Sequence, residues 1–310
     1  MGKFFKNKKT GFGVLAFLAL MLSIVLSCLL PENRMPIRAI GVLTSCFVLW
    51  ISEAMPISVS TLLMIALLPV LGLMDFETIL SSMGINSALF IMASSGMTIA
   101  LCNSAIPKAL TNAVLKKTYR HPTILIASVA ILVSLFSAFV SSLATCVLFT
   151  GLISGMLHEA GIRPKESRMG KNLLIIIPAC SGIGGFMTPA GTPANILVID
   201  LLKTKGIEIS FLKWCAIGFP LGILATILFT LSVILIFKPS KETKYEVPIN
   251  RICFSKDDKN VLCIVVLTII GWIVSGFIPG VNITMVALIG VALFFLPPIH
   301  VKQTNRRQKE

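Results

Sequence analysis

The most informative stretch of this sequence is Cys180-Ser-Gly-Ile-Gly-Gly-Phe-Met-Thr-Pro-Ala-Gly-Thr-Pro-Ala-Asn195. It lies inside an apolar segment, residues 173–202, that is long enough to cross a bilayer. The middle of that segment does not form a regular helix, because Pro189 and Pro193 each lack an amide hydrogen and clash with the preceding turn. In hydrocarbon, a broken backbone is tolerated only where it lines a cavity or is buried in protein.

Broken helices at mid-membrane depth bind an ion or an anionic substrate in many transporters, so this stretch predicts a transport function. The structural alternative is a helix that is only kinked by proline. Two prolines four residues apart, with glycines on both sides, exceed what a kink needs. We therefore expect a binding site at the break.

The composition is that of a polytopic membrane protein. The 310 residues are 55% hydrophobic and 13% charged, whereas a soluble domain is nearer a quarter charged. The net charge of +14 is spread over short polar segments between apolar runs, so we expect no nucleic-acid partner. The eight cysteines show no metal-binding spacing, and we expect them to behave as small hydrophobic residues.

Apolar runs of about spanning length divide the chain. They cover residues 11–30, 37–52, 56–74, 85–104, 122–157, 172–202, 212–237, 260–278 and 281–297. Lys and Arg are enriched in alternate connecting segments, which places the N-terminus in the cytoplasm and makes the basic first segment the start of an uncleaved span. We expect an integral, multi-pass protein of the cell (inner) membrane, with the lipid bilayer as its surroundings.

The run 122–157 is about twice the length of one span and holds no charge before His158, so we expect a helical hairpin. The sequence leaves open whether the hairpin crosses twice or re-enters on one side. Its middle carries Ser137, Ser141 and Ser142. Hydroxyl oxygens and freed carbonyls are suitable ligands for a hard cation such as sodium. Serines bonded back to their own helix are the structural alternative.

These runs predict the domain organisation, segment by segment. We expect scaffold spans in 1–104, a cytoplasmic amphipathic helix in 105–121, a transport unit in 122–202 (hairpin 122–157, broken helix 172–202), a further span in 203–237, a cytoplasmic connector in 238–259, the first two spans of a second half in 260–297 and a polar tail in 298–310.

Charged residues inside the predicted spans are few. Glu53 stands close to Pro56 at a junction between spans, and we interpret it as a helix-end or turn residue rather than a proton relay. Asp200 comes late in the broken segment, and we expect it to be solvated. No His-Glu-x-x-His, Gly-x-Ser-x-Gly or Walker motif occurs, which argues against an enzyme or an ATP-driven pump and for a gradient-driven carrier.

Three stretches stand out as motifs. They are Trp50-Ile-Ser-Glu-Ala-Met-Pro-Ile57, Val140-Ser-Ser-Leu-Ala-Thr145 and Gly184-Gly-Phe-Met-Thr-Pro-Ala-Gly-Thr-Pro-Ala-Asn195. In these stretches and in their order the chain resembles the divalent anion:sodium symporter family, the carriers of dicarboxylates, citrate and sulfate. The family's corresponding patterns are Trp-x-x-Glu-Ala-x-Pro, a Ser-Asn-Thr hairpin tip and a Gly-Thr-Pro-Pro-Asn loop.

The resemblance implies an all-α fold, an ion-transporter-type half in which a re-entrant helical hairpin and a broken transmembrane helix hold substrate and sodium near the midplane. It also implies inverted repeats and a homodimer with elevator-type motion. The implied sodium ligands are Ser137, Ser141, Ser142 and the carbonyl of Gly191. The residues implied to face a small anionic substrate are Ser142, Leu143, Thr192 and Pro193. The remaining loop positions are Thr188, Pro189, Ala194 and Asn195. No organic cofactor and no metal beyond sodium is implied.

Two departures from the family pattern bear on function. The tip reads Ser141-Ser142-Leu143, and Leu143 offers no hydrogen bond to a carboxylate, so we expect substrate affinity or identity to differ from typical members. The chain also stops soon after Pro297, where the family continues with a second half. We expect a truncated product, a half that pairs with another chain, or an incomplete gene model.

Together these observations predict a secondary active transporter, a sodium-coupled carrier of a di- or tricarboxylate or a related divalent anion. The alternative from another class is a non-transporting membrane scaffold or assembly subunit derived from such a carrier. Within transport, a proton-coupled or arsenite-type carrier is the nearest rival.

Overall fold

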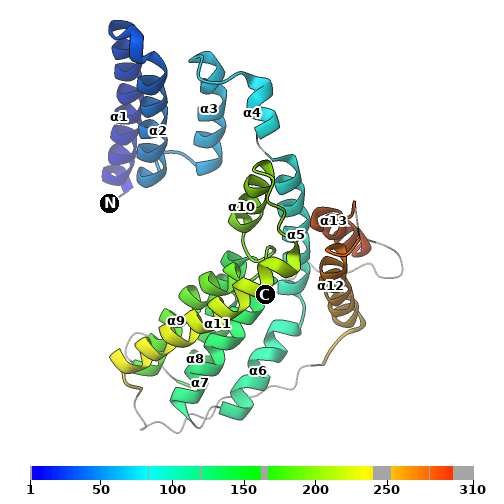
Figure 1. The fold of residues 1–310 in the computed structure, drawn as a ribbon. Helices are drawn as coiled ribbons and strands as arrows, with labels where there is room; N and C mark the ends of the chain where they lie inside the picture. The colour runs from blue at the N-terminus through cyan, green and yellow to red at the C-terminus, as the bar shows by residue number, and fades with distance from the viewer. Residues whose placement is uncertain are drawn as a thin grey trace. The chain divides into compact units, whose positions relative to one another are not determined.

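The structure is a computed structural model that describes residues 2–82, 84–118, 121–161, 167–239, 253–278 and 280–295 (Figure 1). Across these ranges the secondary structure is helical, without strands. The chain divides into two compact units, Met1–Gly84 and Ile85–Glu310. Most of the predicted connector 238–259 and all of the predicted tail 298–310 lie outside the described residues.

The first unit contains α1 (Gly2–Leu29), a short 3₁₀ helix η1 (Pro31–Asn33), α2 (Arg34–Ser52), α3 (Ile57–Val70) and α4 (Phe76–Ser82). The second unit contains α5 (Ile85–Asn103), α6 (Ile106–Thr118), α7 (Pro122–Ser137), α8 (Ser142–Glu159), α9 (Arg168–Phe186), α10 (Pro193–Thr204), α11 (Phe211–Ile236), α12 (Lys256–Ser275) and α13 (Ile283–Leu293).

In the part of the chain that the structure describes, 7 helices are long and apolar enough to cross a membrane. They lie at Gly11–Leu29, Pro31–Ser52, Ile85–Asn103, Ser142–Glu159, Arg168–Phe186, Phe211–Ile236 and Lys256–Ser275. Three further apolar helices, α3, α7 and α13, are shorter. The prediction of an all-α polytopic membrane protein is confirmed.

The first unit is held together by Arg38 of α2. Its Nε donates to the Ser27 hydroxyl of α1 at 3.0 Å, and its Nη1 donates to the Leu71 carbonyl after α3 at 2.7 Å. Ser45 of α2 also donates to the Ala16 carbonyl of α1 at 2.9 Å. Hydrogen bonds between apolar helices fix their register, because no water competes for the same groups.

The turns of the first unit follow from local chemistry. Glu53 caps the C-terminus of α2 in the left-handed region with φ 48°, which confirms its interpretation as a helix-end residue. The Asp75 carboxylate accepts hydrogen bonds from the hydroxyl and the backbone amide of Thr78 at 2.6 and 3.0 Å. These bonds hold the pKa of Asp75 below its ordinary value.

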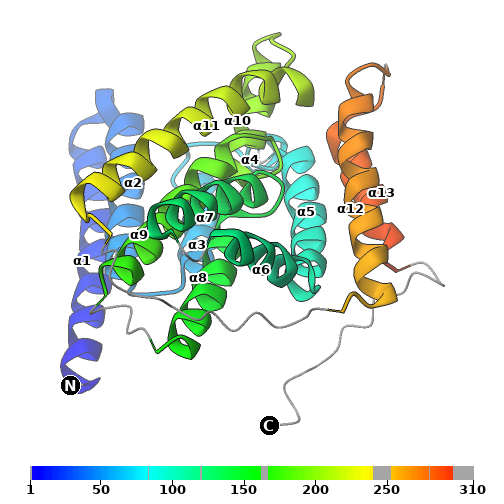
Figure 2. The same cartoon turned by 90° about the horizontal axis from the view of Figure 1, so that it is seen from below.

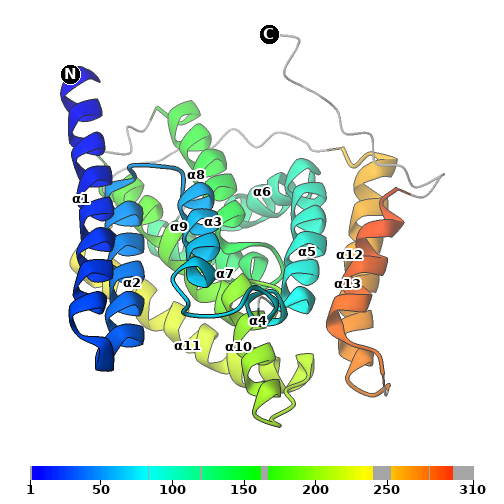
Figure 3. The same cartoon turned by 90° about the horizontal axis from the view of Figure 1, so that it is seen from above.

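The second unit is built around α9. This helix packs against α7, α8 and α11, and α6 packs against α7. The contacts bury apolar side chains such as Ile126, Val133 and Ile176, all without solvent exposure. Beside this group, α12 and α13 lie side by side against α5 (Figure 2 and Figure 3). Trp272 of α12 donates to the Ile283 carbonyl at 3.0 Å and so joins α12 to α13.

The run 122–157 is interrupted at residues 138–141, named here the hairpin tip, between α7 and α8. The 16 residues of α7 extend about 24 Å, short of the roughly 30 Å of a hydrocarbon core. This length favours a re-entrant hairpin over two complete crossings. Residues 56–74 and 281–297 likewise form helices shorter than their apolar runs. The chain turns after α3 at Gly72, where φ is +66°.

Close approach of α7 and α9 requires glycine. A Cβ on Gly184 would lie 2.1 Å from the backbone oxygen of Ser134, whereas a Cβ on Gly182, on the same helix, would meet nothing within 4 Å. We expect Gly184→Ala to force the two helices apart and to cost about 1–3 kcal/mol of stability. Thermal unfolding of the purified protein in detergent measures this loss.

Gly182→Ala is the matched control for that variant. It adds the same methyl group to the same helix and should leave the melting temperature unchanged or raise it, since alanine favours helix. Equal melting temperatures for the two variants would contradict the observed packing.

Candidate functional site

The break in the apolar segment 172–202 falls at residues 187–192, named here the break loop, between α9 and α10. Pro193 occupies the first position of α10, where a missing amide hydrogen costs nothing, and Thr192 precedes it in an extended conformation. The loop residues Thr188, Pro189 and Gly191 are buried. The freed backbone therefore lies within protein, as a non-aqueous surrounding demands.

The start of α8 and the hairpin tip both bond to the break loop. The backbone amide of Ser142 donates to the Gly191 carbonyl at 3.2 Å, and the Thr188 hydroxyl donates to the Ala138 carbonyl. The first bond brings the N-termini of α8 and α10 together, and the second brings together the C-termini of α7 and α9. The ends of α7 and α9 and the starts of α8 and α10 thus meet at one place, named here the junction.

Glycine makes this junction sterically feasible. A Cβ on Gly191 would lie 2.5 Å from the Gly185 oxygen, and a Cβ on Gly185 would lie 3.0 Å from the Cβ of Ser142. Real Cβ atoms do not approach a backbone oxygen to 2.5 Å, so a larger residue at 191 would push the break loop away from α9.

Asn195 holds the two sides of the break together. Its Nδ2 donates to the Gly185 carbonyl at 2.8 Å and to the Thr188 carbonyl at 2.7 Å. The side chain lies in α10 and is 5% exposed, while the two acceptors lie at the end of α9 and in the break loop. Carbonyls that lose helical partners at the break are thereby satisfied.

Serines of α7 bond to the neighbouring helices. Ser137 is fully buried and donates to the Ser181 carbonyl of α9 at 2.6 Å. Ser134 donates to the Cys180 carbonyl at 3.1 Å and shares a 2.9 Å hydrogen bond with Thr226 of α11. The hydroxyl oxygen of Ser137 keeps acceptor capacity.

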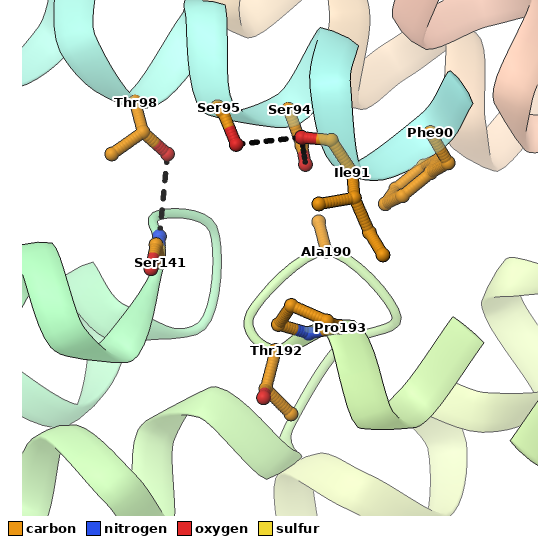
Figure 4. Close-up of a pocket in the computed structure, with 9 residues that line it drawn as sticks. All are labelled: Phe90, Ile91, Ser94, Ser95, Thr98, Ser141, Ala190, Thr192 and Pro193. Carbon is orange, nitrogen blue, oxygen red and sulfur yellow. Dashed lines mark hydrogen bonds between the residues drawn. The ribbon is translucent and has the colours of Figure 1, made fainter. Parts of the chain in front are cut away.

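A small pocket opens between α5 and the junction (Figure 4). Its lining residues come from α5, the hairpin tip, the break loop and the first position of α10: Phe90, Ile91, Ser94, Ser95, Thr98, Ser141, Ala190, Thr192 and Pro193. The volume is about 30 Å³. That is room for a water molecule or a bare ion, and a di- or tricarboxylate does not fit. Five of the nine side chains carry a hydroxyl group, and none carries a charge.

The sequence-predicted site residues are not all brought together. Ser141, Thr192 and Pro193 line the pocket, and Ser142 and Gly191 join the junction beside it. Ser137 lies deeper, against α9. Leu143 is 79% exposed and is not among the lining residues, and Ala194 is also exposed.

Sequence analysis missed the contribution of α5. Thr98 accepts a 3.3 Å hydrogen bond from the backbone amide of Ser141, and the dashed line in Figure 4 marks it. Ser94 and Thr98, four residues apart, put hydroxyls on one face of an apolar helix. That spacing was the available signal.

The expectation for Asp200 was wrong. This carboxylate is not free in solvent, because Oδ1 accepts a hydrogen bond from Nδ2 of Asn86 at 3.2 Å and Oδ2 accepts one from the Ser87 hydroxyl. The side chain is half-buried between α10 and α5. Its donors lie 113 and 114 residues away in sequence, which no local pattern indicates.

The arrangement suits ions of both signs. The N-terminal turns of α8 and α10 carry backbone amides without helical partners, which favour an anion. The hydroxyls and the carbonyls at the ends of α7 and α9 offer oxygen ligands to a cation. Among the described residues, no group of three or more His, Cys, Asp or Glu side chains is placed to hold a metal ion.

Comparison with known proteins gives a family match. The family model described as citrate transporter matches residues 47–306. An uncharacterized transporter of Haemophilus influenzae is 24% identical over 266 residues, 85% of this chain and 56% of its own length. The inorganic phosphate transporter PHO87 of Saccharomyces cerevisiae is 24% identical over 296 residues, 91% of this chain and 31% of its own length.

A third relative is the sodium-dependent high-affinity dicarboxylate transporter 3 of Caenorhabditis elegans. It is 23% identical over 289 residues, 81% of this chain and 50% of its own length. The chain thus spans from about a third to somewhat more than half of the length of these relatives.

Replacing Asn195 tests the break directly. We expect Asn195→Asp to destabilise the junction, because it removes two donors and sets a carboxylate against two carbonyl oxygens. The Gly185 carbonyl is left without this donor, at a cost of about 1–3 kcal/mol, while the Thr188 carbonyl keeps its 3.3 Å hydrogen bond from the Gly191 amide. Thermal unfolding in detergent measures the loss.

Thr204→Ala is the control, because this exposed hydroxyl of α10 bonds only to Leu201 of its own helix. It should melt at the temperature of the parent chain. An Asn195→Asp protein as stable as this control would show that the amide does not hold the break.

Proposed function

Since this chain belongs to the citrate transporter family, we propose that it acts as a secondary active carrier that couples sodium movement to uptake of a di- or tricarboxylate or a related divalent anion. The observation that carries the proposal is the hydrogen bond from the Ser142 amide to the Gly191 carbonyl. This bond joins the first residue of α8 to the break loop just before α10, where the apolar segment is interrupted and buried.

The anion half of the proposal rests on the two helix starts. Ser142 begins α8 and Pro193 begins α10, and the bond at Gly191 keeps them adjacent. Each helix N-terminus carries the equivalent of about half a positive charge, and two together attract a dianion. The pocket of about 30 Å³ is too small for the anion itself, so we propose that the anion binds at the two helix starts beside it, through backbone amides and hydroxyls such as that of Thr192.

The cation half rests on oxygen ligands and size. Ser137, Ser141 and Ser142 supply hydroxyls, and the Gly191 carbonyl has a second lone pair besides the one used by Ser142. Thr145, one turn into α8, has a fully buried hydroxyl without a hydrogen-bond partner among the described residues, and it is a further oxygen close to the hairpin tip. Neutral oxygens in a space of about 30 Å³ favour a small monovalent cation over a large one.

The remaining features of the proposal concern the whole assembly. We propose a homodimer or a pairing with a second-half chain, and an inner-membrane location with a cytoplasmic N-terminus. Lys and Arg enrichment in alternate connecting segments supports the orientation.

Uptake into proteoliposomes tests the coupling. We expect an inward sodium gradient, and not an equal potassium gradient, to drive accumulation of at least one of labelled succinate, citrate, sulfate and phosphate. The four anions distinguish a carboxylate carrier from carriers of inorganic anions. The chain is measured alone and with a co-expressed second-half chain, and no sodium-driven uptake in either case would overturn the proposal.

Ser142→Ala and Thr192→Ala test the site. Each removes one proposed oxygen ligand, and we expect at least about tenfold weaker apparent affinity, for sodium at Ser142 and for the anion at Thr192. Ser232→Ala is the control, since its exposed hydroxyl bonds to Leu228 of its own helix. If the two site variants match this control, the alternative of a membrane scaffold without transport is favoured.

A further inference from the structure

Helix α5 stands between the candidate site and a separate pair of helices. It packs on α12 and α13 on one side and on α8 and α10 on the other. The backbone amide of Ala105, just after α5, donates to the Asp258 carboxylate at the start of α12 at 2.7 Å. The Thr284 hydroxyl of α13 donates to the Asn86 carbonyl near the start of α5 at 3.4 Å. Both ends of α5 are therefore tied to α12 and α13.

The first contact of α5 with the site elements is polar and holds α10. Asp200 of α10 accepts from the Asn86 amide and from the Ser87 hydroxyl, so both carboxylate oxygens are used. Ser87 is 1% exposed. These donors lie in the first turn of α5, where the helix dipole further favours an anion. A carboxylate is an expensive group to bury among apolar helices unless its partners are fixed.

The second contact holds the hairpin tip. Thr98 accepts from the Ser141 amide at 3.3 Å, immediately before α8 begins. Thr98 lies eleven positions after Ser87, which is about 17 Å along the helix. One helix therefore fixes both elements whose N-termini form the junction, at two points far enough apart to set their angle.

We propose that α5 positions the N-termini of α8 and α10 for ligand binding, and that Asp200 is a positioning residue for the ion site. This inference rests on the proposed function. Asp200 does not line the pocket, so it acts through α10, whose first residue, Pro193, does. Seven residues separate Pro193 from Asp200, two turns of the same rigid helix.

A purely structural role makes a different prediction. If the Asp200 contact only stabilises the fold, its loss lowers the melting temperature equally with and without sodium. If it positions the site, its loss also reduces the extra stability that sodium confers, because a ligand stabilises the folded state according to its affinity. The test is therefore a sodium titration of thermal stability, with potassium holding the ionic strength constant, on the full chain in detergent.

We expect Asp200→Ala to weaken the apparent sodium affinity by at least about tenfold relative to the parent chain. Asp257→Asn is the matched control. It also removes one negative charge, and Asp257 is an exposed acid in the first turn of α12. It should titrate as the parent does. The exchanged pair Asn86→Asp with Asp200→Asn restores a carboxylate–amide pair in reverse and should recover most of the lost affinity.

The outcomes separate the two proposals. A parent chain whose melting temperature ignores sodium overturns the sodium site and the role of Asp200 with it. A parent that responds to sodium, with Asp200→Ala responding equally well, overturns the positioning role alone. The positioning role is also overturned if the exchanged pair melts at the parent temperature in potassium but fails to recover the sodium affinity.

Discussion

The architecture of the second unit depends on one constraint: an interrupted helix within an apolar unit must have its free backbone groups satisfied by other parts of the protein. The bond from the Ser142 amide to the Gly191 carbonyl meets that constraint for two segments at once. It also dictates glycine at 185 and 191, since the segments approach too closely for a side chain. The same contact that satisfies the backbone leaves two helix N-termini facing the same space.

Around this junction, several polar side chains form hydrogen bonds between helices. Ser134, Ser137 and Thr188 join α7 and the hairpin tip to α9, α11 and the break loop. The Thr188 bond satisfies the Ala138 carbonyl at the end of α7, and the bonds of Ser134 and Ser137 give buried hydroxyls acceptors among apolar helices. The buried hydroxyl of Thr145 and the buried oxygen of Asn172 have no partner, so satisfaction is incomplete within the described part of the unit.

Local sequence signals predicted the elements well and the contacts poorly. Pro189 and Pro193 among glycines marked the break, and the uncharged run 122–157 marked the hairpin. Both signals lie in one contiguous stretch of sequence and need no knowledge of distant contacts. Ser137 was predicted as an oxygen ligand for a cation because it lies near the middle of that run. The partners of Asp200 and the role of Thr98 were missed, because they depend on how helices far apart in sequence pack. Helix ends at α3 and α13 also differ from the apolar runs, since apolar character continues beyond the helix.

Leu143 shows what a motif match does and does not transfer. Its position in the hairpin sequence suggested a substrate contact, yet its side chain is 79% exposed and the pocket is lined by neighbouring residues instead. Residue 142 bonds to the Gly191 carbonyl through its backbone amide, which is present whatever side chain stands at this position. In the proposed anion site, the attraction exerted by the helix starts therefore does not depend on the side chains of residues 141–143, and selectivity among anions falls to the few hydroxyls that remain.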